Sequence, residues 1–174
     1  MIPKIAIVGP ESTGKSSLAA DLAQHYQVDW VREYAREYLD QLGRDYVQSD
    51  LLEIAHGQLK LEDAGLQKKP KLLICDTNLI VIKIWSEFKY ARCDQALQLL
   101  FNFSEYPLYL LCDIDVPWTY DSQREHPHLR QELLDMYKKE LEQEKLNYVI
   151  ISGAKEERLQ TAVKEINSQI FAKQ

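Results

Sequence analysis

The chain has 174 residues, a length typical of one domain with a full hydrophobic core, and we expect a single domain over residues 1–174. Apolar residues make up 45% and charged residues 28%, as in ordinary soluble proteins. The net charge of −6 argues against a general nucleic-acid or membrane-surface binder, because both need a basic face. Neither kind of partner is therefore expected.

Cysteine usage and targeting signals together predict a cytoplasmic location. The three cysteines, Cys75, Cys93 and Cys112, are an odd number, which is typical of reduced thiols. The first residues lead directly into an apolar run without a secretory signal. No stretch of the chain approaches the roughly 18 consecutive apolar residues of a membrane helix.

The first motif along the chain is a phosphate-binding loop at residues 9–17. Its sequence, GPESTGKSS, contains the pattern Gly-x-x-x-x-Gly-Lys-Ser. An apolar run at residues 5–8 precedes it and predicts a buried strand, and apolar residues repeat at helical spacing over residues 18–26. Strand, glycine loop and helix in this order are the context that the motif requires.

The chemistry of this loop predicts that ATP and Mg²⁺ bind there. Backbone N–H groups of such a loop converge on the β-phosphate. Lys15 is expected to bridge the β- and γ-phosphates, and the Ser16 hydroxyl is expected to hold Mg²⁺. The motif indicates a nucleoside triphosphate but leaves open how the phosphate is used. The expected nucleotide-binding residues of the loop are Gly9, Glu11, Ser12, Thr13, Gly14, Lys15, Ser16 and Ser17.

The rest of the chain alternates short apolar runs with amphipathic segments. Runs at residues 28–31, 71–75, 108–112 and 148–151 predict four further strands with helices between them. This alternation predicts an α/β fold with a five-stranded parallel sheet and helices on both faces. In such sheets ligands bind at the carboxyl ends of the strands. The polar residues that this rule brings to one rim are the phosphate loop, Glu33, Asp76, Asp113, Asp115, Ser152 and Gly153.

The position of Asp76 and the residue that follows it favour a kinase over other classes of triphosphate-binding protein. Asp76 ends an apolar run, the position from which phosphate-loop proteins hold the hydration shell of Mg²⁺, although a cap for the following helix is the alternative. Thr77 stands where motor and ring ATPases usually place a water-activating glutamate, and the chain contains no Asn-Lys-x-Asp guanine motif. A small-molecule kinase fits this pattern best.

A kinase also needs groups that bind its acceptor. Glu33 is a candidate base for the acceptor hydroxyl, and the alternative is a first-turn charge in the field of a helix dipole. Arg36, one turn later, is expected either to pair with Glu33 or to bind substrate. Trp85 and Trp118 are candidates for lining a ring-binding pocket, although core packing is the more common role of such aromatics.

An arginine-bearing lid is expected at residues 115–130, between the fourth strand and the next helix. Mobile lids of phosphoryl-transfer enzymes carry arginines that stabilise the transferred group and expel water. Arg124 and Arg130 are the candidates, and the alternative for both is a solvent-exposed loop charge. Gly153 and Arg158 follow the last strand, where related folds, by analogy, bind adenine.

Several stretches together resemble the kinase domain of NadR-type ribosylnicotinamide kinases. The resemblance implies a three-layer P-loop kinase fold and ATP-dependent phosphorylation of the 5′-hydroxyl of nicotinamide riboside. It also implies that the loop Lys and Ser serve ATP and Mg²⁺, that the residues after the third strand lie near metal and ribose, and that Arg124 belongs to the lid. The resembling stretches are GPESTGKSS at 9–17, REYARE at 32–37, IAHGQ at 54–58, ICDTN at 74–78, DVPW at 115–118 with Asp121 and Arg124, and Gly153 with Arg158.

The acceptor side departs from the family pattern. Asn78 replaces a second aspartate after the third strand, and Ser122 replaces a glycine of the lid. Arg32 stands where an aromatic residue helps to stack the nicotinamide ring, and Ala64 or Gly65 stands where a tyrosine is expected. Because the nicotinamide ring is cationic, an arginine in place of an aromatic residue disfavours it.

Three functions therefore remain open. The leading one is a nicotinamide riboside kinase. The second is a kinase of another nucleoside, nucleotide or metabolite, and the third is a regulatory ATP-binding protein or ATPase of the same family. The sequence gives no indication of the oligomeric state. In the leading hypothesis Lys15, Glu33, Asp76 and Arg124 are catalytic, Ser16 and Asp76 hold the metal, and Glu33, Arg36, Asp76, Asn78 and Trp85 contact the acceptor.

Overall fold

The computed structural model describes residues 2–121, 123 and 128–172. Five strands form one central sheet in the order β2-β3-β1-β4-β5, and every neighbouring pair is parallel. This confirms the α/β fold with a five-stranded parallel sheet that the alternating pattern predicts. The strands are β1 (Lys4–Val8), β2 (Trp30–Val31), β3 (Leu73–Asp76), β4 (Leu108–Cys112) and β5 (Tyr148–Ile151).

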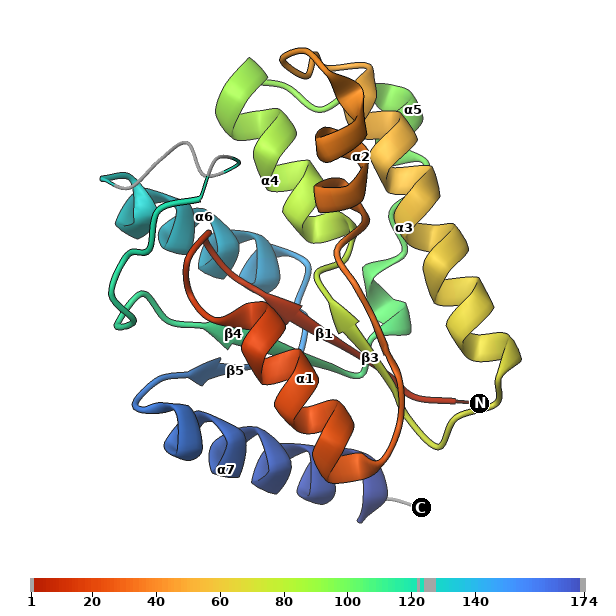
Figure 1. Ribbon diagram of the computed structural model, residues 1–174, viewed down its shortest axis with the longest axis vertical. Helices are drawn as coiled ribbons and strands as arrows, with labels where there is room; N and C mark the ends of the chain where they lie inside the picture. Colours follow the sequence, from red (N-terminus) through yellow and green to blue (C-terminus); the bar gives the residue numbers. More distant parts are fainter. Residues whose placement is uncertain (1, 122, 124–127, 173–174) are drawn as a thin grey trace.

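Helices cover both faces of the sheet and give the molecule three layers (Figure 1). Two helices lie on one face: α1 (Lys15–Tyr26) and α7 (Lys155–Ile166), the latter continued by the π-helical turn η2 (Asn167–Phe171). The other face carries α2 (Tyr34–Leu42), α3 (Asp50–Gln67), α4 (Leu79–Tyr90), the short α5 (Gln95–Gln98), the 3-10 turn η1 (Phe103–Glu105) and α6 (Arg130–Gln143).

The hydrophobic core is divided by the sheet into two clusters. Alternate residues of β1 belong to different clusters, because side chains of a strand point to opposite faces. Ala6 and Val8 pack with the side of α3, α4 and α6, whereas Ile5 and Ile7 pack with α1 and α7. All five residues of β1 are buried, as expected for the central strand of a covered parallel sheet.

Three strands differ in their bounds from the sequence prediction, the first only because it begins at Lys4 instead of residue 5. The second strand was expected at residues 28–31 but contains only Trp30–Val31, because the Val28 N–H donates to Ala23 O at 3.0 Å and so closes α1. The third strand was expected at residues 71–75 but includes Asp76, which pairs with Ile7 of β1. The carboxylate of Asp76 therefore starts from a rigid strand.

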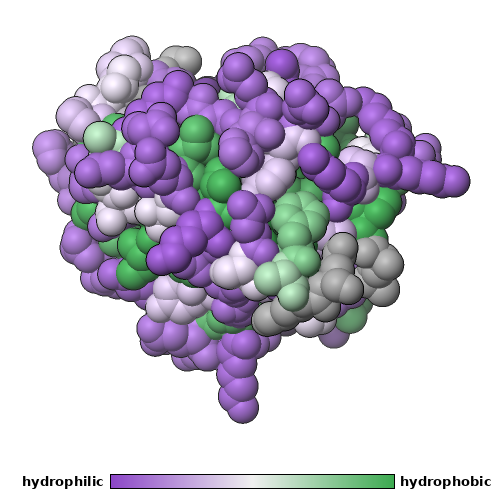
Figure 2. All heavy atoms as spheres, turned by 90° about the horizontal axis from the view of Figure 1, so that it is seen from below, coloured by the Kyte–Doolittle hydropathy of each residue, from purple (hydrophilic) through white to green (hydrophobic). Residues whose placement is uncertain are grey.

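The face that Figure 2 shows is covered mainly by hydrophilic side chains, with hydrophobic groups in small areas between them. Within residues 2–121, 123 and 128–172, the helices are all too short or too polar to span a membrane.

Candidate active site

The phosphate loop runs from the end of β1 to the start of α1, and two glycines shape it. Gly9 has φ of +136°, and a Cβ at this position would lie 2.7 Å from Cys112 O of β4. Gly14 has φ of +79° and is the N-cap of α1. Only glycine fits both positions without strain. The loop therefore folds tightly around the N-terminus of α1, where backbone N–H groups favour an anion.

The Lys15 side chain lies along the phosphate loop. Its Nζ donates to Gly9 O at 2.9 Å and to Pro10 O at 2.8 Å. Ser16, the next residue, is exposed at the first turn of α1. Lysine, serine and helix N-terminus thus converge on one point, as the motif predicts for a triphosphate site.

Asp76 provides a buried carboxylate beside Ser16. Its side chain is 3% exposed, and its Oδ1 has no hydrogen-bond partner within the described residues. Burial raises the pKa of Asp76, whereas a hydrogen bond with the Ser16 side chain and the charge of Lys15 lower it. A buried acceptor oxygen beside a serine hydroxyl suits Mg²⁺, which usually takes few protein ligands together with phosphate oxygens. The residues present thus fit the expected metal.

The Asn78 side chain does not reach the site at the carboxyl ends of the strands. Thr77 has φ of +74°, which is unusual for a β-branched residue and turns the chain sharply after Asp76. Asn78 is consequently fully buried, where its Oδ1 accepts from the Ile80 N–H at 3.2 Å and its Nδ2 lies 3.3 Å from Tyr109 Oη. The structure places Asn78 as the cap of α4, so it corrects the expectation that Asn78 contacts the acceptor. Asp76 is therefore not the N-cap of α4, which was the alternative role considered for it.

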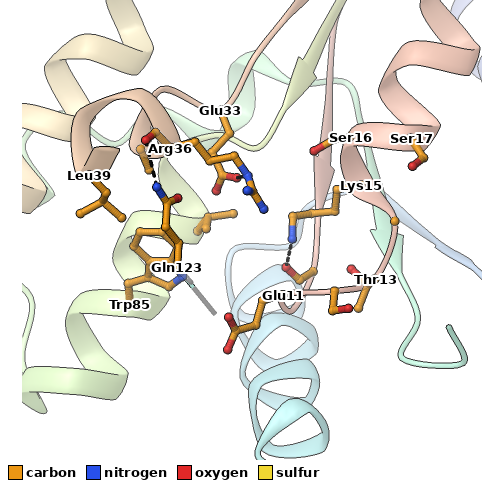
Figure 3. A pocket seen from close by; sticks show the side chains of 15 residues that line it. Glu11, Thr13, Lys15, Ser16, Ser17, Glu33, Arg36, Leu39, Trp85 and Gln123 are labelled. Atoms are coloured by element: carbon orange, nitrogen blue, oxygen red, sulfur yellow. Dashed lines mark hydrogen bonds and ion pairs between the residues drawn. The ribbon is translucent and has the colours of Figure 1, made fainter. Parts of the chain in front are cut away.

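Glu33 faces Lys15 across the pocket that Figure 3 shows. Its side chain is only 12% exposed, and its Oε2 lies 3.4 Å from Arg36 Nε. Glu33 is the N-cap residue of α2, yet within the described residues its side chain makes no capping hydrogen bond. Burial raises the pKa of Glu33, the charge of Lys15 lowers it, and the charge of Asp76 raises it further.

The pocket joins the phosphate loop to the α2 and α4 side of the molecule. Its volume is about 130 Å³, and Trp85 of α4 lines it together with the loop, Glu33 and Arg36. Gln123 also lines it and was missed by the sequence analysis, although it lies within the expected lid. Its Nε2 donates to Asp40 Oδ1 at 2.5 Å and to Arg36 O at 3.2 Å.

The described part of the expected lid contacts both sides of the pocket. The Thr119 N–H donates to Ser12 Oγ at 2.9 Å, and Arg130 Nη1 donates to Ser12 O at 3.3 Å. On the other side, Arg36 Nη1 donates to Asp121 Oδ2 at 3.0 Å. Arg124, the expected lid arginine, lies outside the described residues.

A second hollow of about 540 Å³ lies on the other side of the loop, where adenine is expected. Arg158, 5% exposed, borders it and donates to Thr13 O at 2.9 Å and to Gly153 O at 3.0 Å. It also forms an ion pair with Asp115. The buried Arg158 side chain therefore links the phosphate loop to the turn at Gly153. The residues that line this hollow are Gly14, Ser17, Leu18, Asp21, Asp115, Val116, Pro117, Gly153, Ala154, Lys155 and Arg158.

Comparison with known families shows which family the chain belongs to. Residues 4–158 match a family model described as "AAA domain", which covers most of the chain. The chain belongs to this family of AAA domains.

Two curated relatives of this AAA-domain protein are NadR proteins, as the motifs predict. The trifunctional NAD biosynthesis/regulator protein NadR of Escherichia coli (strain K12) is 29% identical over 124 residues, which are 69% of this chain and 30% of NadR. The Salmonella typhimurium NadR is also 29% identical, over 126 residues. The chain therefore spans about a third of the length of the curated relatives it matches.

Solved structures confirm the fold. A NadR protein in complex with NR superposes with a TM-score of 0.76 at 19% identity, covering 96% of this chain and 50% of that one. A deoxyadenosine kinase from M. mycoides superposes with a TM-score of 0.65 at 16% identity, covering 95% and 99%. The three-layer P-loop kinase fold and the resemblance to the NadR-type kinase domain are thus confirmed.

Proposed function

We propose that the protein transfers the γ-phosphoryl group of ATP to a hydroxyl of a small nucleoside-like acceptor, with nicotinamide riboside as the first candidate. The observation that carries this proposal is Glu33, a buried carboxylate that faces Lys15 across a pocket lined by Arg36 and Trp85. These residues form a second wall opposite the phosphate loop. A kinase needs it, because the acceptor must lie opposite the phosphate donor.

On the donor side, the phosphate loop holds the triphosphate. Backbone N–H groups at the start of α1 and the Lys15 ammonium neutralise the β- and γ-phosphate oxygens, which carry the charge of the transition state. Ser16 and Asp76 would hold Mg²⁺, which supplies further positive charge to the same oxygens. Arg158 keeps the loop in place from behind through its bond to Thr13 O.

On the acceptor side, Glu33 accepts a hydrogen bond from the hydroxyl that attacks. As the new O–P bond forms and the bond to the leaving ADP breaks, the hydroxyl proton passes to the Glu33 carboxylate. Arg36 holds that carboxylate in place through its Nε. Thr119 and Gln123 close over the pocket from the lid, and exclusion of water protects the phosphoryl group from hydrolysis.

A specific observation favours a second candidate, an acceptor with an uncharged ring. The guanidinium of Arg32 lies 5.4 Å from the centroid of the Trp30 ring. The Lys89 ammonium lies 3.5 Å from the centroid of the Tyr46 ring. Both rings thus already interact with a protein cation, so a cationic nicotinamide ring must compete for them.

An assay that couples ADP formation to added acceptors tests the proposal. We expect ADP release to rise at least about tenfold with one member of a panel of nicotinamide riboside, its uncharged reduced form, adenosine and cytidine. Lys15→Ala should abolish this activity, because the lysine contacts the phosphates directly. Equal ADP release with and without every acceptor would overturn the kinase proposal.

Thermal unfolding separates a kinase from a regulatory ATP-binding protein. We expect a non-hydrolysable ATP analogue with Mg²⁺ to raise the melting temperature, and an acceptor to raise it further, since each ligand that binds the folded state adds stability. Stabilisation by the nucleotide alone, with no further shift from any acceptor, would favour the regulatory function.

A further inference from the structure

A hollow of about 510 Å³ lies where β2 leads into α2. Trp30 and Arg32, at the end of β2, line it, and it shares Ser16, Glu33 and Arg36 as walls with the pocket of the candidate active site. The two spaces therefore meet at the reacting groups. A volume of about 300–1,000 Å³ is common for small-molecule sites. We call this space the β2 hollow.

We propose that the β2 hollow selects an acceptor nucleoside whose base carries a carboxylate, and that Arg32 binds this carboxylate while the sugar hydroxyl points to Glu33. The inference rests on the proposed kinase function. The family resemblance implies where the acceptor lies, whereas the charge of its base follows from a residue in which this chain departs from the family pattern. That residue is Arg32, which stands where an aromatic residue is expected.

The Arg32 guanidinium is a cation without a carboxylate partner among the described residues. Its interaction there is with the Trp30 ring, whose centroid lies 5.4 Å from the guanidinium carbon. The other arginine of the hollow, Arg36, is already paired, because its Nε lies 3.4 Å from Glu33 Oε2 and its Nη1 donates to Asp121 Oδ2 at 3.0 Å. Arg32 therefore supplies the N–H donors that this hollow still offers to an oxyanion.

Trp30 helps to hold the Arg32 guanidinium in place. Trp30 is aligned with Ile74 of β3 and is partly buried, so the ring starts from a paired strand. An arginine on an aromatic ring is held by cation–π attraction while its N–H groups stay available for the two oxygens of a carboxylate. The same contact covers the ring with a cation. Recognition in this hollow therefore depends on charge and not on stacking against Trp30.

The surrounding charges favour a carboxylate over a phosphate. A phosphate monoester carries about 1.5–2 negative charges at neutral pH, and the acidic walls of the hollow oppose this charge more than that of a carboxylate. Glu37 is exposed and forms no ion pair within the described residues, so it offers a negative charge to a cationic ring. A base with both a cationic ring and a carboxylate thus matches Glu37 and Arg32. The acidic residues that line the hollow are Glu33, Glu37, Asp40 and Asp76.

Nicotinic acid riboside and nicotinamide riboside test this proposal, because they differ only in a carboxylate or a carboxamide on the same cationic ring. We expect the kcat/KM for phosphorylation of the acid to exceed that of the amide at least about tenfold, since only the acid forms a charged pair with Arg32. Arg32→Ala should lower the kcat/KM of the acid about tenfold and leave that of the amide no lower than in the wild type. Arg32→Lys keeps the charge and should retain part of the preference.

Arg92→Ala is the matched control. It also removes one exposed positive charge, but it lies outside the hollow, where Arg92 donates to Gln48 Oε1 at 3.1 and 3.0 Å. It should change neither kcat/KM, and an unchanged KM for ATP in all variants shows that they are folded. Turnover with equal kcat/KM for the two ribosides, or with a preference that persists in Arg32→Ala, overturns the carboxylate site and leaves the kinase function intact.

Two further measurements separate the remaining outcomes. A kcat/KM for cytidine 5′-monophosphate above that for cytidine, lost in Arg32→Ala, would show that Arg32 binds a phosphate and overturn the carboxylate site. Calorimetric titration with a non-hydrolysable ATP analogue and Mg²⁺ separates binding from catalysis. Tighter binding of the acid than of the amide, lost in Arg32→Ala, supports the site even if neither riboside is phosphorylated, and then only the kinase function fails. If neither riboside binds or reacts, both proposals fail.

Discussion

Glu33 and Asp76 line one hollow together with Ser16 and Arg36, and we propose different tasks for the two carboxylates. Burial raises the pKa of both. Asp76 lies on the strand beside the Ser16 side chain, with one oxygen left for a metal, whereas Glu33 lies opposite with Arg36. The charge of Asp76 raises the pKa of Glu33 further, and the charge of Lys15 lowers it. Glu33 is therefore the group best placed to exchange a proton.

Substitution of Glu33 tests this assignment. We expect Glu33→Gln to lower kcat by about 10²–10⁴-fold with little change in the KM for ATP, since a general base contributes this much. A base must be ionised, and its pKa is raised. The kcat/KM of the wild type should thus fall as the pH drops through a value above the ordinary 4.5 of glutamate. A pH–rate profile that keeps the same acidic limb in Glu33→Gln would rule out this role.

At the scale of elements, the start of α2 is positioned by α3. The Tyr34 N–H donates to Gln58 Oε1 at 2.9 Å, which satisfies a free donor at the helix N-terminus. The Tyr34 ring lies on Gly57, the neighbouring residue of the IAHGQ stretch. Because Glu33 directly precedes Tyr34, these two contacts also set the position of Glu33.

A side chain at Gly57 should disturb this arrangement. The Cβ of Gly57→Ala would lie 2.0 Å from Tyr34 Cε1, so the ring must move. We expect a loss of roughly 1–3 kcal/mol in the free energy of unfolding, measured by urea denaturation, and a lower kcat. Tyr34→Ala removes the clash, so the double variant should lose less stability than the two single variants together. Additive losses would contradict the contact.

The two arginines of the expected lid, Arg124 and Arg130, lead to a further prediction. Arg130 donates to Ser12 O and Val116 O, so its contacts lie within the lid and the phosphate loop. Arg124 is the remaining arginine expected to cover the transferred group. We expect Arg124→Ala to lower kcat by about 10²-fold or more while changing the KM for ATP much less, because its interaction belongs to the transition state. Steady-state kinetics that show an unchanged kcat would refute the lid role.

At the scale of the whole molecule, Arg158 connects three strand ends. From α7 it reaches the phosphate loop after β1 through Thr13 O, the end of β4 through Asp113 O and Asp115, and the turn after β5 through Gly153 O. Helix α7 thereby joins the donor half of the site, although it belongs to the far end of the chain.

Removal of this guanidinium should affect stability and nucleotide binding together. We expect Arg158→Met to lower the free energy of unfolding by roughly 3 kcal/mol and to raise the KM for ATP, because three backbone oxygens lose a charged donor. Lys155→Ala is the control from the same hollow. Among the described residues it breaks the ion pair of the exposed Lys155 with Asp21, worth about 0.2–1 kcal/mol. Equal losses in both variants would contradict the bracing role.

Local patterns sufficed to predict the phosphate loop and its place between a strand and a helix. The phosphate loop is a continuous stretch between a strand and a helix, and its glycines are needed for local reasons of φ and close approach. The alternation of apolar runs and amphipathic segments likewise predicted the five strands and the parallel sheet. The edge strand β2 was predicted too long, because the Val28 N–H closes α1 instead of pairing with β3.

Which side chains face the pocket was decided only by the tertiary structure. Asn78 follows the rim in sequence, but a left-handed residue turns it into the core. Gln123 carries no motif and still borders the pocket, because its side chain donates to Arg36 O and Asp40 Oδ1 of α2. A motif specifies the chemistry of consecutive residues, whereas the acceptor wall is assembled from separate elements. The sequence by itself therefore determined the phosphate loop, and packing decided which side chains lie opposite it.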